Sequence, residues 1–216
     1  MSCQTGNDPK FPKLPDGSRD LDKTWSHIQT WLEMEKLMKT GKVKAIGVAN
    51  YSVRYLEELL PHATIIPAAN QIENHPSLPQ QEIVDFCKAK GIHITAYSPL
   101  GSSGSPMLKA EAVVEVAKKR NVTPAAVLLS YHREYPLINR CRNLGFDVIA
   151  VARGSSVLAK SVNPDRIQAN LESLVALDEE EMKILNSYSL QLQKEGKLMR
   201  YVYPSFGVDF GFPDKS

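Results

Sequence analysis

The sequence has 216 residues, of which 43% are hydrophobic and 23% are charged, and its formal net charge is +2. This composition is typical of one globular domain or of part of a larger one, and the small charge excess argues against a dedicated surface for nucleic acid or acidic membrane. No apolar run reaches the roughly 18 residues that a membrane span needs, and residues 1–20 lack the apolar stretch of a signal peptide.

The predicted elements alternate between strands and helices after a loop over residues 1–20, which is rich in Pro, Gly and Asp. Short apolar runs predict strands over 43–50, 65–73, 92–100 and 155–161. Apolar residues near helical spacing predict helices over 22–39, 53–60, 79–90, 109–120, 124–132, 163–174 and 179–188. The tail over 198–216 has no period and predicts an ordered loop, in which the aromatic residues either line a pocket or pack: Tyr201, Tyr203, Phe206 and Phe210.

Local signals mark several helix ends. Ser52 is suited to capping the helix over 53–60, and Ser77 with Pro79 to opening the helix over 79–90. Glycine closes two helices, at Gly41 and Gly91. The other start signals are Thr123-Pro124, Asn163-Pro164, and the pair Asp178 and Glu181, which is typical of a capping box.

Cysteine and histidine usage does not indicate a metal site or a disulfide framework. Cys3, Cys87 and Cys141 are odd in number, lie far apart and form no CxxC pair. His62 and His75 are interpreted as turn residues and not as metal ligands. We therefore expect reduced thiols and a cytoplasmic location.

The alternation of strands and helices predicts an α/β fold with a parallel sheet and crossover helices. The strands are apolar almost throughout, so both faces of the sheet are expected to be covered. Polar residues follow the strands closely: Asn50; Gln71, Glu73 and Asn74; Tyr97 and Ser98; Lys160 and Ser161. In a β/α barrel these positions share the rim where ligands bind. An open doubly wound sheet also binds at this edge, but it usually carries a GxGxxG turn, which the sequence lacks.

The types of residue at the strand ends suit a phosphorylated nicotinamide dinucleotide. Asn50 and Gln71 carry side-chain amides that can both donate to and accept from a planar carboxamide. Tyr97 offers a flat face for stacking. The turn with Ser98, Leu100 and Ser102 can donate hydrogen bonds to a phosphate. Lys160 and Arg166 place two cations beside the start of the helix at Asn163, which favours an anion such as a 2′-phosphate.

Each of these residues also has a simpler interpretation. An Asn that ends a strand is often a turn former. A partly buried Tyr is often part of the core. A Lys–Arg pair is often solvated surface. Only their joint placement at one edge of the sheet supports a binding site.

Four segments resemble the cofactor-binding half of the aldo-keto reductase family, and in particular its fungal NADP-dependent members of the glycerol dehydrogenase, glyceraldehyde reductase and galacturonate reductase type. They are TGKVKAIGVANYS, NQIENHP, ITAYSPLGSS and VLAKSVNPDRIQANLE. The tail RYVYPSFGVDFGFPDKS is similar to theirs too. The resemblance runs from about Gly6 to the end, with one interruption.

The resemblance implies a (β/α)8 TIM barrel that transfers hydride between NADP(H) and a small carbonyl or polyol substrate. Asn50 and Gln71 would hold the nicotinamide carboxamide, and Tyr97 would stack on its ring. The expected ligands of the pyrophosphate are Ser98, Leu100 and Ser102, and those of the 2′-phosphate and its ribose are Lys160, Ser161, Val162 and Arg166. Asn170 would contact the adenine.

The sequence departs from the family pattern in three places. Ala49 stands where the family has Ser or Cys, which removes one hydrogen bond worth about 0.5–1.5 kcal/mol. Ala169 stands where Glu is common near the adenine. No residue matches the catalytic Asp, Tyr, Lys and His of the first four strands. The expected fold is therefore a partial barrel of roughly the last four β/α units plus the C-terminal loop, in one N-terminally truncated domain over 1–216.

The missing tetrad leaves two functions open. The chain is either the C-terminal half of an NADP-dependent oxidoreductase or a non-catalytic remnant that binds NADP or acts as a scaffold or regulatory subunit. Without a positioned proton donor, carbonyl reduction loses about 10²–10⁴-fold in rate. The chain by itself is therefore expected to be inactive.

An atypical insertion over 133–150 interrupts the connection between a helix and a strand, which usually takes about 2–6 residues. It has no helical or strand period, and it carries apolar residues that are costly to expose, such as Leu137 and Phe146. One interpretation is a tolerated surface insertion. The other is a retained intron, because Arg133-Glu134-Tyr135 can be encoded by a run that contains a common splice-donor sequence.

Overall fold

The computed structural model describes residues 12–132, 154–203 and 208–215. Its described residues contain a parallel sheet with the strand order β1-β2-β3-β4. The strands are β1 Val48–Ala49, β2 Ala69–Glu73, β3 His93–Tyr97 and β4 Ser155–Leu158. This confirms the predicted α/β class with parallel strands in chain order.

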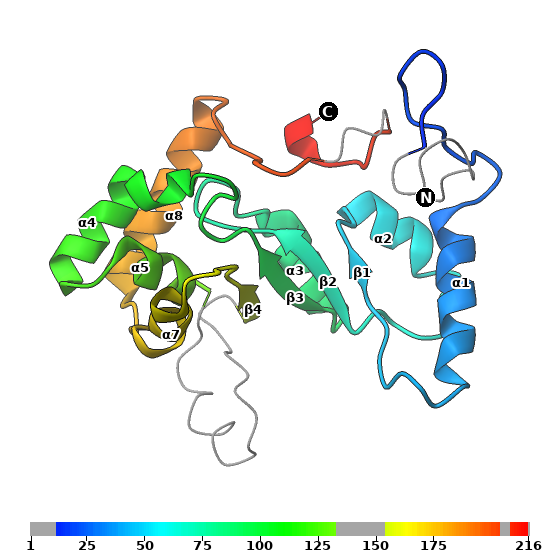
Figure 1. Ribbon diagram of the computed structural model, residues 1–216, viewed down its shortest axis with the longest axis horizontal. Coiled ribbons are helices and arrows are strands. Elements are labelled where there is room, and N and C mark those ends of the chain that lie inside the picture. Colours follow the sequence, from blue (N-terminus) through cyan, green and yellow to red (C-terminus); the bar gives the residue numbers. More distant parts are fainter. Residues whose placement is uncertain (1–11, 133–153, 204–207, 216) are drawn as a thin grey trace.

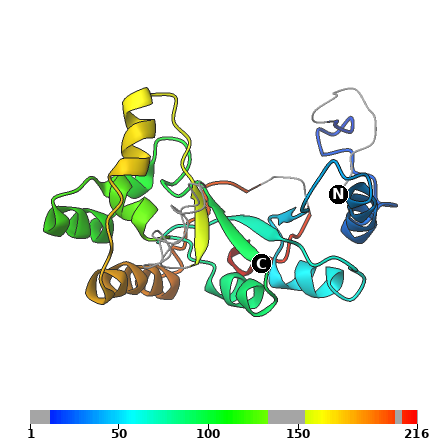
Figure 2. The same ribbon diagram turned by 90° about the horizontal axis from the view of Figure 1, so that it is seen from below.

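Helices connect the strands. They are α1 His27–Met38, α2 Val53–Leu59, α3 Gln81–Ala89, α4 Glu111–Arg120, α5 Pro124–Ser130, α7 Pro164–Glu172 and α8 Glu179–Lys194, with short 3₁₀ helices η1 Pro106–Lys109 and η2 Pro213–Lys215. Helix α1 lies at one end of the molecule, and α4, α5 and α7 lie at the other (Figure 1). Seen from below, α2, α3 and α8 lie along one side of the sheet, and α7 lies on the opposite side (Figure 2).

Four helix starts, those of α2, α5, α7 and α8, agree with the sequence signals. The side chains of Ser52, Thr123 and Asn163 accept hydrogen bonds from the first turns of α2, α5 and α7. Asp178 and Glu181 form the predicted capping box of α8. These caps satisfy amide groups that have no partner inside the helix.

Several predicted boundaries were wrong. Helix α1 begins at His27 and not at residue 22, because Ser26 forms a capping box with Gln29. Helix α3 begins at Gln81, after Gln80 with a positive φ of 43°, and neither Ser77 nor Pro79 caps it. The strands are shorter than the apolar runs, and α8 continues to Lys194 beyond the predicted end at 188.

The core is divided into three clusters of buried apolar side chains. The largest joins α4, α5 and α8 around Val113, Val127 and Leu185. A second packs the sheet onto α3 through Ile72, Ile94 and Cys87. The third packs α1 against α2, and the side chains at its centre are Trp31, Ile46 and Leu59. The sheet is thus covered by helices on the face that Ile72 and Ile94 share.

The other face of the sheet is not apolar. In β3, His93 is exposed and Thr95 and Tyr97 are half-buried, whereas Ile94 and Ala96 are buried. Gln71, which pairs in register with Thr95, is also exposed. The expectation that both faces are covered therefore holds for only one face within the described residues. The second face carries polar side chains because alternate residues of a strand point to opposite sides.

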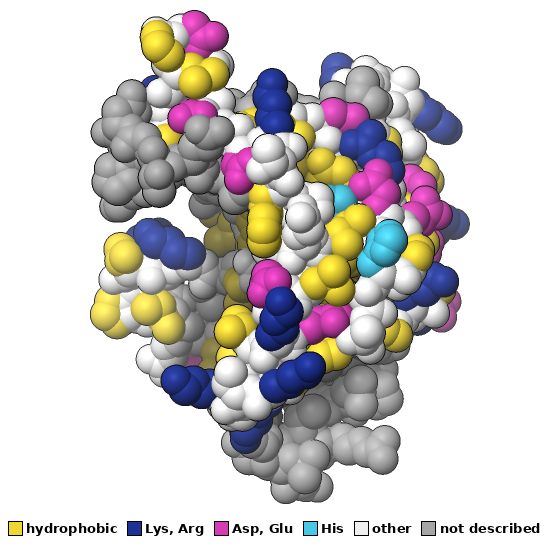
Figure 3. Space-filling view, turned by 90° about the vertical axis from the view of Figure 1, so that its right-hand side faces the viewer, with side chains coloured by type: hydrophobic (Ala, Val, Ile, Leu, Met, Phe, Trp, Pro, Cys, Tyr) yellow, Lys and Arg dark blue, Asp and Glu magenta, His cyan; other side chains and the backbone are white. Residues whose placement is uncertain are grey.

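Basic and acidic side chains are interspersed on the face of the molecule beside α1 (Figure 3). That distribution agrees with the net charge of +2. No helix within the described ranges is long and apolar enough to cross a bilayer. The predicted insertion over 133–150 lies outside the described residues.

Candidate cofactor site at the strand ends

Strained backbone conformations concentrate in the loops that follow β1, β2 and β3. Six non-glycine residues in the described ranges have a positive φ, and five of them lie in these loops: Asn50, Gln80, Ser98, Ser102 and Ser105. Such conformations cost free energy and persist where the surrounding structure fixes them, often at binding sites. The carboxyl edge of the sheet is therefore a candidate binding site.

Asn50 and Tyr97 meet at this edge. The phenol of Tyr97 donates a hydrogen bond of 2.9 Å to Oδ1 of Asn50. The amide nitrogen of Asn50 donates to the carbonyl oxygen of Gln71 over 2.9 Å, which continues the β1–β2 ladder. Asn50 has a φ of 59°, so it is a turn former as well as a side-chain partner of Tyr97.

A buried amide fixes the turn that carries Asn50. The side chain of Asn70 donates to the carbonyl oxygen of Tyr51 over 2.9 Å and accepts from its amide nitrogen over 3.3 Å. This contact ties β2 to the loop that follows β1. This role of Asn70 was not predictable from the sequence, since an Asn inside an apolar strand gives no signal of the loop that it will hold.

The phenol of Tyr97 lies in an environment that disfavours ionisation. Burial, with a smaller contribution from the nearby Glu73 carboxylate and an opposing one from Arg200, raises the pKa of Tyr97 to about 12. Tyr97 is therefore neutral at physiological pH and offers a hydrogen-bond donor and a flat ring.

The side chain of Gln71 is exposed at the middle of β2. It shares one face of the sheet with Glu73 and lies in register between Ala49 and Thr95. Gln71 lines neither of the two cavities described below. It therefore stands beside the Asn50–Tyr97 pair and not with the basic residues.

A cavity of about 530 Å³ lies between the loops that follow β3 and β4. Seven of the residues selected from the sequence line it: Ser98, Leu100, Ser102, Lys160, Ser161, Val162 and Arg166. We call it the β3–β4 cavity. It forms because β3 and β4 are neighbours in the sheet, so their following loops leave the same edge.

The β3–β4 cavity is basic. Among the described residues, neither the ammonium of Lys160 nor the guanidinium of Arg166 has a carboxylate within ion-pair distance. By contrast, Arg120 and Arg200 are paired with carboxylates. Two cations without counterions at the start of a helix favour an anionic ligand.

A second cavity of about 310 Å³ adjoins the first and shares Leu100, Lys160 and Arg166 with it. Asn170 and Ala169 of α7 also line it. The residues selected for the phosphate and for the adenine therefore lie along one continuous surface. At its start, Asn163 caps α7 and accepts a hydrogen bond from the Ser161 hydroxyl over 3.4 Å.

The eleven selected residues thus fall into two neighbouring groups. Asn50, Gln71 and Tyr97 lie at the ends of β1, β2 and β3, and the other eight lie around the two cavities. Ser98 directly follows Tyr97 and connects the groups. The described residues contain no cluster of three or more His, Cys, Asp or Glu that could hold a metal ion.

One feature of this edge gave no functional prediction from the sequence. The buried carboxylate of Glu73 accepts hydrogen bonds from the amide nitrogens of Tyr201 and Val202, over 2.8 and 2.9 Å. Glu73 could be recognised as a charged residue at the end of an apolar strand. Its partners could not, because they lie more than a hundred residues away in the sequence.

A sequence model described as "Aldo/keto reductase family" matches residues 15–189 of the chain. D-galacturonate reductase of Hypocrea jecorina is 61% identical over 211 residues, which cover 98% of this chain and 62% of that protein. Glycerol 2-dehydrogenase (NADP(+)) of Saccharomyces cerevisiae is 44% identical over 198 residues, which cover 90% of this chain and 56% of that protein.

A solved structure of aldose reductase from Giardia lamblia is similar with a TM-score of 0.76 and 33% identity, over 94% of this chain and 62% of that one. The chain therefore spans 56–62% of the length of these three proteins. That share exceeds the half that the motifs predicted. The family match includes every residue of the two groups at the strand ends.

Proposed function

The chain belongs to the aldo/keto reductase family, and from this premise we propose that its strand ends bind NADP(H) as part of an oxidoreductase for small carbonyl compounds and alcohols. The observation that carries the proposal is the basic β3–β4 cavity, in which Lys160 and Arg166 have no carboxylate partner within the described residues. A phosphate would supply the missing negative charge.

We assign each part of the dinucleotide to residues along this edge. Lys160, Ser161, Val162 and Arg166 would hold the 2′-phosphate and its ribose, and Asn170 the adenine. The turn with Ser98, Leu100 and Ser102 would hold the pyrophosphate. Asn50 and Gln71 would hold the nicotinamide carboxamide, with Tyr97 against the ring. When bound, the cofactor would supply a hydride for a carbonyl carbon.

The substrate is proposed to be a small polyhydroxylated carbonyl compound or the corresponding alcohol. Support comes from the names of two relatives, which act on galacturonate and glycerol. The reducing cytoplasm is the proposed location, and the buried thiol of Cys87, which is free, is compatible with it.

The proposal includes a partial barrel that is not catalytic by itself. Hydride transfer to a carbonyl needs a proton donor, and a lowered pKa makes a tyrosine a better one. Four described tyrosines have shifted pKa values, and burial is the main cause of a raised pKa in each: Tyr51, Tyr55, Tyr97 and Tyr201. This favours a second candidate function, in which the 216-residue chain binds NADP(H) without turning it over.

Titration of the purified 216-residue chain with NADPH and NADH, followed by fluorescence, tests the proposal. We expect saturable binding of NADPH that is at least about tenfold tighter than that of NADH, because only NADPH carries the 2′-phosphate. We expect no NADPH oxidation with glyceraldehyde above a blank without protein. Equal affinity for the two cofactors would contradict the assignment of the β3–β4 cavity, and measurable turnover would contradict the non-catalytic candidate.

A further inference from the structure

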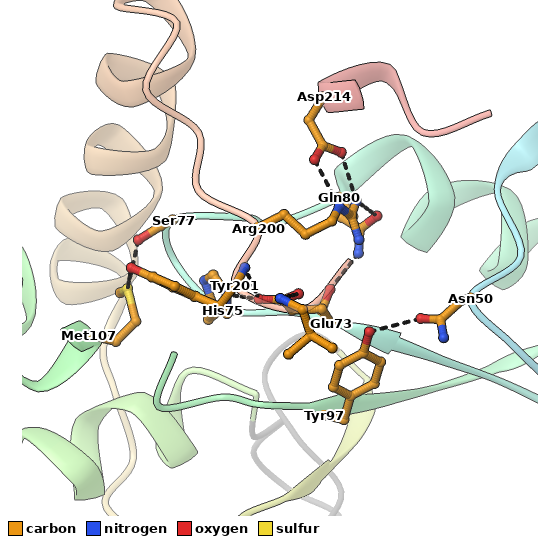
Figure 4. Close-up of polar contacts among 11 residues, drawn as sticks. Asn50, Glu73, His75, Ser77, Gln80, Tyr97, Met107, Arg200, Tyr201 and Asp214 are labelled. Atoms are coloured by element: carbon orange, nitrogen blue, oxygen red, sulfur yellow. Dashed lines mark hydrogen bonds and ion pairs between the residues drawn. The ribbon is translucent and has the colours of Figure 1, made fainter. Parts of the chain in front are cut away.

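The carboxylate of Glu73 is fully buried at the end of β2. Its two oxygens accept the amide hydrogens of Tyr201 and Val202, and Nε2 of His75 lies 3.0 Å from Oε1 (Figure 4). A buried carboxylate is costly unless hydrogen bonds compensate for its lost hydration. These three contacts compensate for it, and the two from Tyr201 and Val202 require the C-terminal segment to lie across the end of β2.

A second set of contacts holds the same segment. Arg200 forms a two-pronged ion pair with Asp214 over 2.8 and 2.6 Å and donates to Oε1 of Gln80 over 2.8 Å. Its guanidinium lies 4.0 Å from the ring centre of Phe212. The side-chain amide of Gln80 donates to the carbonyl oxygen of Glu73. The segment is thus bound to β2 both directly and through the loop that follows it.

We call this set of residues the C-terminal clasp: Glu73, His75, Gln80, Arg200 and Asp214. Figure 4 shows the clasp above Tyr97 at the edge of the sheet, with Asn50 to the right. In Figure 1 the chain after α8 runs along this edge from α8 towards α2. The clasp therefore covers the strand ends from the side opposite to α7.

The clasp adjoins only one of the two groups of candidate cofactor residues. Glu73 is the partner of Tyr97 in the β2–β3 register, and Tyr97 holds Asn50. None of the clasp residues lines the β3–β4 cavity or the neighbouring cavity. A substitution in the clasp should therefore affect the Asn50–Tyr97 pair and leave the β3–β4 cavity unchanged.

We propose that Glu73 is a positioning residue, which docks the C-terminal segment over the end of β2 and thereby fixes Tyr97 and Asn50 for the nicotinamide half of the dinucleotide. This rests on the proposed function, because it assigns one end of the same site. The proposed link runs through the sheet: Glu73 is the register partner of Tyr97, so the hydrogen bonds of Tyr201 and Val202 to Glu73 bring the C-terminal segment to the end of β2 beside Tyr97. Without that contact, the ring and the Asn50 side chain gain freedom that binding must then remove.

The test compares two ligands on the full 216-residue chain. NADPH occupies both ends of the proposed site, and adenosine 2′,5′-bisphosphate occupies only the phosphate end. We expect Glu73→Gln to weaken NADPH binding about tenfold and to change bisphosphate binding less than about twofold, since a lost hydrogen bond to a buried charged group is worth roughly an order of magnitude. Glu82→Gln, an exposed glutamate in the first turn of α3, is the matched control and should change neither.

Hydrogen exchange supplies a readout that does not depend on the ligand. Glu73→Gln should speed exchange of the Tyr201 and Val202 amides, because the carboxylate that protects them is gone. Faster exchange with unchanged NADPH affinity would overturn the positioning role. Equal weakening of both ligands would also overturn it, because the effect would not be confined to one end.

Two controls keep the outcomes separable. If the parent chain binds neither ligand, the proposed function is wrong and this inference is wrong with it. If the parent chain binds NADPH and Glu73→Gln binds it with the same affinity, only the inference about Glu73 is wrong. If Glu73→Gln does not fold, Gln80→Ala removes an outer contact of the clasp and leaves the carboxylate in place. Gln80→Ala should weaken NADPH binding more than bisphosphate binding, by a smaller factor than Glu73→Gln does. An equal effect on the two ligands would count against the proposal.

Discussion

The side-chain oxygen of Asn50 lies 2.9 Å from the phenol oxygen of Tyr97, so the residue that follows β1 and the last residue of β3 are joined across the end of β2. This bond links positions that are not neighbours in the sheet. The side-chain oxygen of Asn50 accepts this bond, and within the described residues its NH₂ group makes no hydrogen bond and can donate to a ligand.

Removing the side chain of Asn50 or the hydroxyl of Tyr97 should lower the free energy of unfolding slightly, and removing both should lower it little more. We expect Tyr97→Phe and Asn50→Ala each to lower the free energy of unfolding by about 0.5–1.5 kcal/mol, with a coupling of similar size in the double mutant. Denaturant unfolding of the four proteins measures the coupling. Tyr188→Phe on α8, combined with Asn50→Ala, is the control and should be additive.

The two basic residues of the β3–β4 cavity should act on the 2′-phosphate. We expect Lys160→Ala and Arg166→Ala each to weaken NADPH binding about 10-fold to 100-fold, because hydrogen bonds to charged groups contribute roughly 1.5–3 kcal/mol. NADH binding should change little. Lys183→Ala on the exposed side of α8 is the control for loss of one positive charge. An equal loss for NADPH and NADH would argue against a 2′-phosphate at this cavity.

The location of this cavity was predictable from the sequence, because it depends on topology alone. Alternating strands and helices place the residues after β3 and β4 at one edge, so Ser98 and Lys160 had to approach each other. Helix starts were predictable for a related reason. A cap such as Ser52 or Asn163 bonds an amide only a few residues away, so the whole signal lies in one short segment.

Strand lengths and the clasp were not predictable, because they depend on distant parts of the chain. Within the run over 43–50, the strand comprises only Val48–Ala49. Gly47 lies so close to β2 that an added Cβ would stand 2.7 Å from the carbonyl oxygen of Ala69. Likewise, the partner of Glu73 is the backbone of Tyr201 and Val202, and a backbone amide gives no sequence signal.

Alkaline pH should unfold the protein through its buried tyrosines. Burial raises the pKa values of Tyr51 and Tyr97 to about 12, whereas an unfolded tyrosine ionises near 10. The two phenols therefore ionise at a higher pH in the folded state than in the unfolded state. The stability that they contribute is complete below pH 10 and is lost as the pH rises towards 12. Denaturant midpoints across this range measure the loss. Tyr97→Phe should make the decline shallower, and an unchanged decline would contradict the assignment to Tyr97.

Acidic pH should destabilise the protein through Glu35, whose carboxylate joins α1 to the residues before β2. Its carboxylate is almost buried and accepts hydrogen bonds of 2.8 and 2.9 Å from the amide nitrogens of Thr64 and Ile65, with further bonds from the Thr64 hydroxyl and the Trp31 indole. Burial by itself would raise the pKa of Glu35, but these hydrogen bonds together outweigh it and hold that pKa below its ordinary value of 4.5.

Because the folded-state pKa of Glu35 is depressed, the stability that it contributes is present above pH 4.5 and is lost as the pH falls through the lower folded value. We expect Glu35→Gln to lower the free energy of unfolding at neutral pH by about 1–3 kcal/mol, since an amide cannot accept all four bonds. Glu33→Gln, on the exposed side of the same helix, should change it by less than about 0.5 kcal/mol. Unfolding curves at neutral and acidic pH distinguish the two. The difference in free energy of unfolding between Glu35→Gln and the parent chain should become smaller at acidic pH. A difference that stays constant would show that the charge of Glu35 does not hold α1 in place.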